Sequence, residues 1–440
     1  MNILGAAGLG LGLLLFAAHA LRLGETGLAA ASLVLLVPLA TRRRFAPYIL
    51  GPTVLLAGLA LAAAARDMVA FRLAAGLPFA RLTVIMAGVV LVCLGSGLFA
   101  CSGRARAFFD RGAAVPGWQA TAFWLTVGLL VTARAKAPFA LLLADRFFPG
   151  WGALEIVLLG FYAAWLTGRM VTAPRTGPIR SRYWAFFSLV FFAQLGLGLA
   201  GATSFLMTGA LHLPVPALIV AGPIYRGGGL FMPILYLGTL LLVGPGWCSH
   251  LCYIGALDDA CARRGRGTPQ RLSPGLARWL PLGRAATLAL AIALALGLRL
   301  AGVGTGPALF AAALFGLAGL GIMVTVSRRA GIMLHCTAYC PIGIVGNVLG
   351  KISPWRLGIG PGCDGCGRCS RACRYLALTP ADLARGRPGL SCTLCGDCVG
   401  ACPAGRLGYH FPGLSPRTAR AAYFTLVVAL HAVFVGVARI

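Results

Sequence analysis

Residues 363–373 read CDGCGRCSRAC, and residues 392–403 read CTLCGDCVGACP. Both stretches place four cysteines at the spacing Cys-x2-Cys-x2-Cys-x3-Cys. Small residues separate the cysteines, among them Gly365, Gly367 and Gly396, and such residues let a backbone curl tightly around a bound group. The chain therefore carries the same four-thiol run twice.

This spacing is typical of bacterial ferredoxins, in which three cysteines of a run bind one 4Fe-4S cluster and the fourth binds the other cluster. On that pattern the first cluster takes Cys363, Cys366, Cys369 and Cys402, and the second takes Cys392, Cys395, Cys398 and Cys373. A zinc ribbon is the alternative, but it needs only two Cys-x2-Cys pairs. One departure is visible, because Arg374 follows the first run where Pro403 follows the second.

The composition around these runs is that of a membrane protein. The chain of 440 residues is 59% hydrophobic and only 11% charged, whereas about a quarter of the residues of soluble domains are charged. About eleven apolar runs are long enough to cross the hydrocarbon layer of a bilayer, which takes about 20 helical residues. They lie near residues 3–22, 24–41, 46–65, 82–101, 118–134, 151–168, 184–207, 229–247, 281–301, 306–326 and 421–438. The sequence therefore predicts a polytopic all-α protein.

The formal net charge of +28 is concentrated in alternate loops of this predicted bundle. Basic loops of membrane proteins face the cytoplasm, so we expect a cytoplasmic amino terminus, an external carboxyl terminus and no nucleic-acid partner. The richest clusters are Arg42, Arg43 and Arg44; Arg104, Arg106 and Arg111; Arg169, Arg175, Arg180 and Arg182; and Arg263, Arg264, Arg266, Arg271 and Arg278.

A second cysteine motif is also repeated. Residues 246–257 read GWCSHLCYIGAL, and residues 334–345 read LHCTAYCPIGIV. If each pair lies on a helix, its two Cβ atoms are about 5–6 Å apart, which is wider than the roughly 3.8 Å of a disulfide. The two pairs together supply four ligands on the cytoplasmic side: Cys248, Cys252, Cys336 and Cys340.

Three interpretations of these four thiols remain open. They could hold a third 4Fe-4S cluster or a tetrahedral metal ion, act as a redox or metal-delivery dithiol, or be structural. His250 and His335 adjoin the pairs and are alternative ligands.

The whole pattern, with GWCSHLCYIGALDD and HCTAYCPIG followed by two ferredoxin runs, resembles the polyferredoxin membrane proteins of the NapH, NosR and CcoG type. The resemblance covers residues 230–409. It implies a bacterial inner-membrane protein that supplies electrons from quinol to a reductase or serves the maturation of metal centres, with Cys248, Cys252, Cys336 and Cys340 as motif cysteines. Two features depart from the pattern: Tyr253 replaces a proline, and several helices precede residue 230.

Other residues are candidates for further cofactors. Residues 211–229 contain three prolines and predict an interrupted, interfacial segment. The candidates are His212, Tyr225 and Arg226 for a quinone headgroup, Thr203 for a covalently bound flavin, and His19 and His431 for haem b.

We therefore predict an all-α polytopic membrane protein of about eleven spans with an inserted small α+β ferredoxin domain. The predicted segments are 1–210 (helical), 211–350 (helical core with both Cys-x3-Cys pairs), 351–415 (two clusters) and 416–440 (last helix). The expected function is electron relay in the bacterial inner membrane between a membrane donor or acceptor, such as quinol, and a redox partner protein or subunit. The alternative is a maturation factor that reduces or delivers a metal for a respiratory enzyme.

Overall fold

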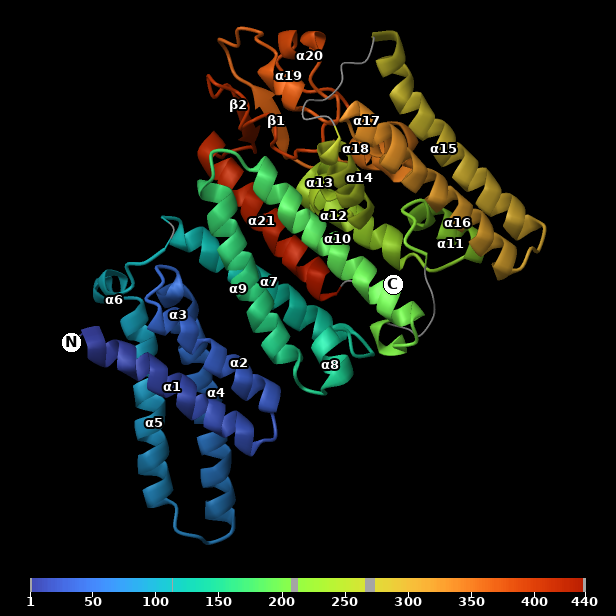
Figure 1. Ribbon diagram of the computed structural model, residues 1–440. Coiled ribbons are helices and arrows are strands. Elements are labelled where there is room, and N and C mark those ends of the chain that lie inside the picture. The colour runs from blue at the N-terminus through green and yellow to red at the C-terminus, as the bar shows by residue number, and fades with distance from the viewer. Residues whose placement is uncertain (1, 113, 207–212, 266–273, 438–440) are drawn as a thin grey trace. The chain divides into compact units, whose positions relative to one another are not determined.

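The computed structural model describes residues 2–112, 114–206, 213–265 and 274–437 (Figure 1). His212 therefore lies outside the described residues. Two compact units are present: one runs up to Thr172 and includes Val428–Val437, and the other is Ala173–Val427. Helices account for 72% of the structure, in agreement with the predicted helical class.

The first unit consists only of helices. Its core is built from α1, α4, α5 and α7, with Leu9, Leu13, Val54 and Cys93 fully buried. Small residues bring α4 and α5 close together, since a Cβ at Gly51 would lie 3.0 Å from the Cβ of Ala100. The elements are α1 (Asn2–Arg22), α2 (Thr26–Val34), α3 (Leu36–Ala40), α4 (Ala46–Ala74), α5 (Ala80–Ala100), α6 (Gly103–Phe108), α7 (Pro116–Lys136), α8 (Leu143–Phe147) and α9 (Gly152–Thr172).

The second unit contains both cysteine motifs. Its helical elements are α10 (Gly177–Leu199), η1 (Thr203–Phe205), α11 (Leu218–Arg226), α12 (Phe231–Val243), η2 (Gly244–Gly246), α13 (Trp247–His250), α14 (Tyr253–Arg264), α15 (Pro274–Leu300), α16 (Thr305–Ile322), η3 (Met323–Ser327), α17 (Arg328–Ala330), η4 (His335–Tyr339), α18 (Pro341–Leu349) and α21 (Pro416–Gly436). The last turns of α21 belong to the first unit.

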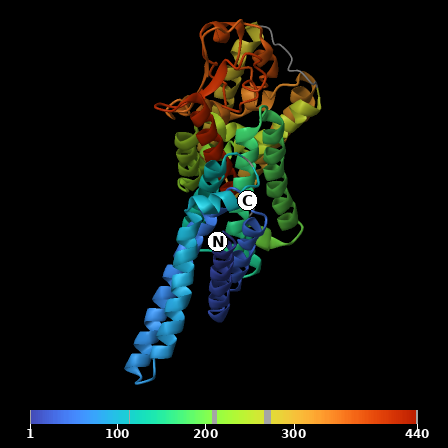
Figure 2. The same ribbon diagram turned by 90° about the vertical axis from the view of Figure 1, so that its left-hand side faces the viewer.

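A small α+β segment lies between α18 and α21. Strands β1 (Arg356–Ile359) and β2 (Leu407–His410) pair antiparallel, with Leu357 opposite Tyr409. Both ferredoxin-like runs, α19 (Arg368–Ala372) and α20 (Pro380–Ala384) lie between the two strands. Figures 1 and 2 place this segment at one end of the second unit. The β1–β2 pair thus joins the two ends of one loop-rich segment that contains eight cysteines.

Nine helices among the described residues are long and apolar enough to cross a membrane. The sequence predicted about eleven such helices by the usual length rule. The predicted span at 24–41 is instead two short helices, α2 and α3. The span at 118–134 is a continuous helix, α7, but Gln119, Arg134 and Lys136 reduce its apolar character. The structure is consistent with a multi-pass membrane protein.

The predicted interruption of residues 211–229 is present. Within its described part, helix α11 has only nine residues and ends at Gly227, whose φ is +71°. Tyr225 donates a hydrogen bond to the carbonyl of Val303.

Candidate metal centres

The four cysteines predicted for the second cluster come together. They line one cavity that contains about 290 Å³ of unfilled space, counted up to its opening. We call this the loop cavity, defined by Cys373, Cys392, Cys395 and Cys398. The other residues that line it are uncharged: Leu357, Tyr375, Ala377, Leu378, Thr393, Leu394 and Gly396.

The backbone repeats the same conformation in both runs. Three left-handed residues occur at equivalent positions: Gly365, Gly367 and Leu376 in the first run, and Leu394, Gly396 and Gly405 in the second. A leucine in this region is sterically unfavourable and persists only where the surroundings enforce it. At Leu394 the carbonyl accepts a hydrogen bond from the buried hydroxyl of Tyr409. The two runs therefore form two copies of one loop, as the spacing predicted.

Hydrogen bonds to sulfur repeat as well. The backbone N–H of Ala377 donates to Sγ of Cys373 over 3.3 Å, and that of Arg406 donates to Sγ of Cys402 over 3.3 Å. In each run the donor lies four residues after the last cysteine. Such bonds stabilise negative charge on a ligating thiolate.

Without a bound metal, burial makes the thiols of the loop cavity weak acids. It raises the pKa of Cys373 and Cys395 to about 12 and that of Cys392 to about 11. Ligation requires thiolates, so metal binding must release these protons. Buried thiols gathered around unfilled space are suited to a permanent metal centre.

The cysteines predicted for the first cluster lie nearer the surface. Cys366 is exposed, Cys363 and Cys402 are half-buried, and Cys369 is buried. Burial raises the pKa of Cys369, with a further contribution from the neighbouring thiol of Cys402. Cys402, the fourth cysteine of the second run, therefore lies near Cys369 of the first run.

Both Cys-x3-Cys pairs meet at one cavity. We call it the helix cavity, defined by Cys248, Cys252, Cys336 and Cys340. It contains about 370 Å³ of unfilled space, counted up to its opening. The exposed fractions of Cys252 and Cys340 are only 7% and 8%. The remaining lining residues are Trp247, Arg284, Ile342, Gly343, Asn347, Tyr375 and Thr393.

The pairs do not lie on continuous helices, so the helical condition placed on their Cβ spacing does not apply. Cys248 lies in the short helix α13 and Cys336 in the π-helical turn η4. The second cysteine of each pair has extended backbone (ψ 114° and 116°) and is the N-cap of the next helix, α14 or α18. Two helix N-termini, which favour negative charge, therefore point at the cavity from Cys252 and Cys340.

Polar atoms without partners surround the helix cavity. Nε of Arg284, Oδ1 of Asn347 and Oγ1 of Thr393 are buried and form no hydrogen bond with described residues. Leaving such atoms unsatisfied costs about 1–3 kcal/mol each. The Nε–H of Arg284 and the hydroxyl of Thr393 are donors, so a negatively charged occupant would offset their share of this cost.

An acid and two histidines adjoin the cavity without lining it. Asp258 accepts a hydrogen bond from the N–H of Cys336, and burial raises its pKa to about 6. His250 contacts the hydroxyl of Tyr183 through Nδ1. His335 packs on Tyr339, and burial lowers its pKa to about 4. Neither histidine is among the lining residues.

The cysteine sets fit clusters better than single ions. Among the residues that the structure describes, no three His, Cys, Asp or Glu side chains lie close enough to hold one metal ion. Ligands of a single zinc ion all lie about 2.3 Å from it, whereas the thiolates of a 4Fe-4S cluster bind separate iron atoms and stand farther apart. Four cysteines around unfilled space match the second arrangement.

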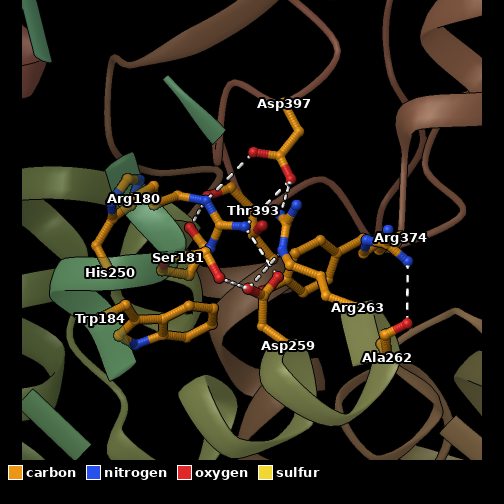
Figure 3. A network of polar contacts seen from close by, with 12 residues as sticks. Arg180, Ser181, Trp184, His250, Asp259, Ala262, Arg263, Arg374, Thr393 and Asp397 are labelled. Atoms are coloured by element: carbon orange, nitrogen blue, oxygen red, sulfur yellow. Dashed lines mark hydrogen bonds and ion pairs between the residues drawn. The ribbon is translucent and has the colours of Figure 1, made fainter. Parts of the chain in front are cut away.

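A buried ion-pair network joins the loop cavity to α14 (Figure 3). Arg180 of α10 donates to Asp259 over 3.0 Å and to Asp397, which lies between Cys395 and Cys398. Arg263 pairs with the same two carboxylates. Burial alone would raise the pKa of Asp259, but the two guanidinium groups outweigh it and hold that pKa below its usual range. Two cations and two anions thus balance beside the loop cavity.

Arg374, the departure noted after the first run, is a further anchor. It is buried and donates to the carbonyls of Gly331 and Ala262. Its own carbonyl accepts from the N–H of Met333. Proline could make none of the side-chain bonds, so this position ties the first run to the ends of α14 and α17.

The two cavities share a wall. Tyr375 and Thr393 line both of them. The hydroxyl of Tyr375 donates to the carbonyl of Cys248, and the carbonyl of Thr393 accepts from Ser249. The loop cavity and the helix cavity are therefore neighbours, separated by these side chains.

Comparison with known families supports an iron–sulfur centre. A model described as a 4Fe-4S binding domain matches residues 225–269, which include Cys248 and Cys252. No curated protein and no solved structure matches the chain. The matched region bears on the helix cavity rather than on the ferredoxin-like runs.

The minor candidates are scattered through the structure. Thr203 is exposed in η1. His431 is buried and contacts Tyr162, and His19 lies in the last turn of α1. The helix cavity also contains a residue that sequence reasoning missed, Arg284. An arginine within an apolar run such as 281–301 is costly in a membrane, and that cost was the available signal.

Proposed function

We propose that the protein is an iron–sulfur electron-transfer protein of the bacterial inner membrane, related to the polyferredoxin type. Two 4Fe-4S clusters are held by the ferredoxin-like runs: Cys363, Cys366, Cys369 and Cys402 for one, and Cys373, Cys392, Cys395 and Cys398 for the other. A third is held by Cys248, Cys252, Cys336 and Cys340 in the helix cavity. Such clusters accept and release single electrons when bound.

The wall shared by the two cavities is the observation that carries this proposal. Tyr375 and Thr393 touch both cavities, so two centres held there would be only side chains apart. The N–H groups of Ala377 and Arg406 would donate to the sulfurs of Cys373 and Cys402, and the buried walls of the loop cavity would limit solvent around the second cluster. In this proposal the residues around the cavities position and shield the redox centres, and electron transfer requires no conformational change.

The positions of the sites suggest the two ends of the relay. Cys248 belongs to a candidate span ending at His250, and Arg284 belongs to the candidate span Trp279–Leu300. The helix cavity would therefore exchange electrons with a membrane donor or acceptor such as quinol. Arg368 and Arg371 of the first run and Arg406, which follows the second run, are exposed and would attract an acidic redox partner protein.

The proposed orientation follows the basic loops. The β1–β2 segment and both cavities would face the cytoplasm, with the amino terminus inside and the carboxyl terminus outside. Residues 1–210 and 416–440 would anchor the core 211–350 and the cluster segment 351–415. Reporter fusions to the carboxyl terminus test this, because an active periplasmic reporter is expected there and an active cytoplasmic reporter would reverse the topology.

Iron counting tests the cluster assignment. Anaerobically purified protein should contain about twelve iron atoms, four for each cluster. The variants Cys248→Ser and Cys336→Ser should each lower this to about eight. Cys261→Ser, on α14 but outside the helix cavity, should leave it at about twelve. An iron content of about eight in the unaltered protein would remove the third centre.

The maturation-factor alternative gives a different result. A site that passes on a metal needs thiols that a partner can reach, whereas Cys252 and Cys340 are buried. Iron that stays constant in Cys248→Ser, together with a loss of bound copper or zinc, would favour metal delivery over electron relay.

A further inference from the structure

The two cavities differ in charge although both are lined by four cysteines. No charged side chain among the described residues lines the loop cavity. The nearest ion pairs, between Arg180, Arg263, Asp259 and Asp397, balance each other. The helix cavity is lined by Arg284, which forms no ion pair within the described chain. Its guanidinium remains protonated in proteins.

Local packing directs Arg284 into the cavity. The preceding residue, Gly283, lies against η4, and a Cβ there would be 2.6 Å from the carbonyl oxygen of Ala338. One turn later, Thr287 donates to the carbonyl of Tyr339 over 2.7 Å. Helix α15 is thus fixed against the segment that carries Cys336 and Cys340. Arg284 is only 2% exposed and is held beside the thiols.

An isolated buried cation is unfavourable unless an anion lies next to it. Asn347 and Thr393, which line the cavity together with Arg284, are neutral polar residues. The carboxylate of Asp258 accepts a hydrogen bond from the N–H of Cys336 but does not line the cavity. A centre with four thiolates would supply the missing negative charge. Each added electron makes that centre more negative, so its attraction to Arg284 increases on reduction.

We propose that Arg284 sets the reduction potential of the centre in the helix cavity, and that it makes this centre easier to reduce than the one in the loop cavity. The inference rests on the proposed third centre. It assigns a direction to the relay, because an electron added to the protein resides preferentially beside Arg284. In the test the electron comes from dithionite, which is oxidised as one centre is reduced by one electron.

A redox titration of the anaerobic full-length protein, followed by EPR, tests this assignment. The signal of the helix cavity is identified as the one missing from Cys248→Ser. In Arg284→Gln we expect the equilibrium constant for reduction of that signal to fall at least tenfold, which is about 59 mV for one electron. The other two signals should keep their midpoints.

Three control variants separate charge from packing. Arg284→Lys keeps the charge and should stay near the original midpoint. Arg299→Gln removes an arginine from the same helix outside the cavity and should change nothing. Asn347→Leu removes a neutral polar group from the same wall and should shift the midpoint less than Arg284→Gln does.

The outcomes are distinguishable. Iron near eight in the unaltered protein defeats the third centre itself, before Arg284 is at issue. Iron near twelve with an unshifted midpoint in Arg284→Gln overturns the role of Arg284 alone. Loss of four irons from both Arg284→Gln and Arg284→Lys also overturns it, because the residue would then hold the cavity together. Loss of four irons from Arg284→Gln only, while Arg284→Lys keeps all its iron and the original midpoint, supports the role of Arg284.

Discussion

The loop cavity and the helix cavity present the same four ligands by different means. Within the loop cavity, three cysteines lie in a span of seven residues, and the fourth, Cys373, is the last cysteine of the first run. The helix cavity takes two cysteines from near residue 250 and two from near residue 338, with Arg284 from a third element. A local loop can form its site from backbone conformation, whereas the other site exists only when distant helices are in place.

That difference predicts how each cavity responds to damage. The ion-pair network of Arg180, Arg263, Asp259 and Asp397 joins the loop cavity to α14, whose N-cap is Cys252 of the helix cavity. Changes in this network should therefore weaken both cavities. Changes in the loop backbone should affect the loop cavity alone.

The largest effect is expected from Arg180→Met. It leaves the carboxylates of Asp259 and Asp397 paired with Arg263 alone, and removing one partner of a buried pair typically costs about 3–5 kcal/mol. The thermal midpoint of the detergent-solubilised protein should fall markedly. Arg182→Met, an exposed neighbour on α10, is the control and should behave like the original protein. Equal midpoints for the two variants would mean that the network contributes little.

A smaller and more local effect is expected from Gly396→Ala. Gly396 has φ +81°, where a side chain costs about 1–2 kcal/mol. The new Cβ would also lie 2.5 Å from the hydroxyl of Tyr409. Iron should fall towards about eight as the loop cavity loses its four-iron centre, while the EPR signal missing from Cys248→Ser remains.

Gly405→Ala is the matched control for Gly396→Ala. Its φ is +60°, but a Cβ there would have no neighbour within 4 Å. It should keep more iron than Gly396→Ala. Simultaneous loss of the helix-cavity signal in Gly396→Ala would contradict the independence of the two cavities.

Arg374→Met should have an intermediate effect. It removes the hydrogen bonds to Gly331 and Ala262, and a hydrogen bond to a charged group contributes about 1.5–3 kcal/mol. The variant should unfold at a lower temperature than Arg371→Met, which alters an exposed arginine of the same run. Unchanged unfolding would show that the position after Cys373 is not an anchor.

The smallest effect is expected from Tyr375→Phe. It keeps the ring between the cavities and removes one long hydrogen bond, 3.4 Å, to the carbonyl of Cys248. We expect a loss of no more than about 1 kcal/mol and full iron content. Tyr375→Ala opens the wall, so it should cost more and expose both cavities to oxygen. Similar oxygen sensitivity in the two variants would argue against the ring as a barrier.

The loop cavity could be predicted from sequence because its cysteine spacing and backbone conformation are local. The π-helical turn at Cys336 and the N-cap position of Cys340 could not, since the segments that carry them pack against α15. Arg284 was hidden for the same reason: its place in the helix cavity comes from the close approach at Gly283. The predicted span at 24–41 also failed locally, because its apolar helical stretch, Thr26–Ala40, is shorter than a membrane-crossing helix.

The anchoring of Arg374 and the shared position of Tyr375 have a consequence for dissection of the chain. Excising residues 351–415 as a soluble fragment would take one wall away from the helix cavity and leave a cationic side chain without its carbonyl acceptors. Such a fragment would expose apolar surface that the helices normally cover. Both cavities lie within the compact unit Ala173–Val427.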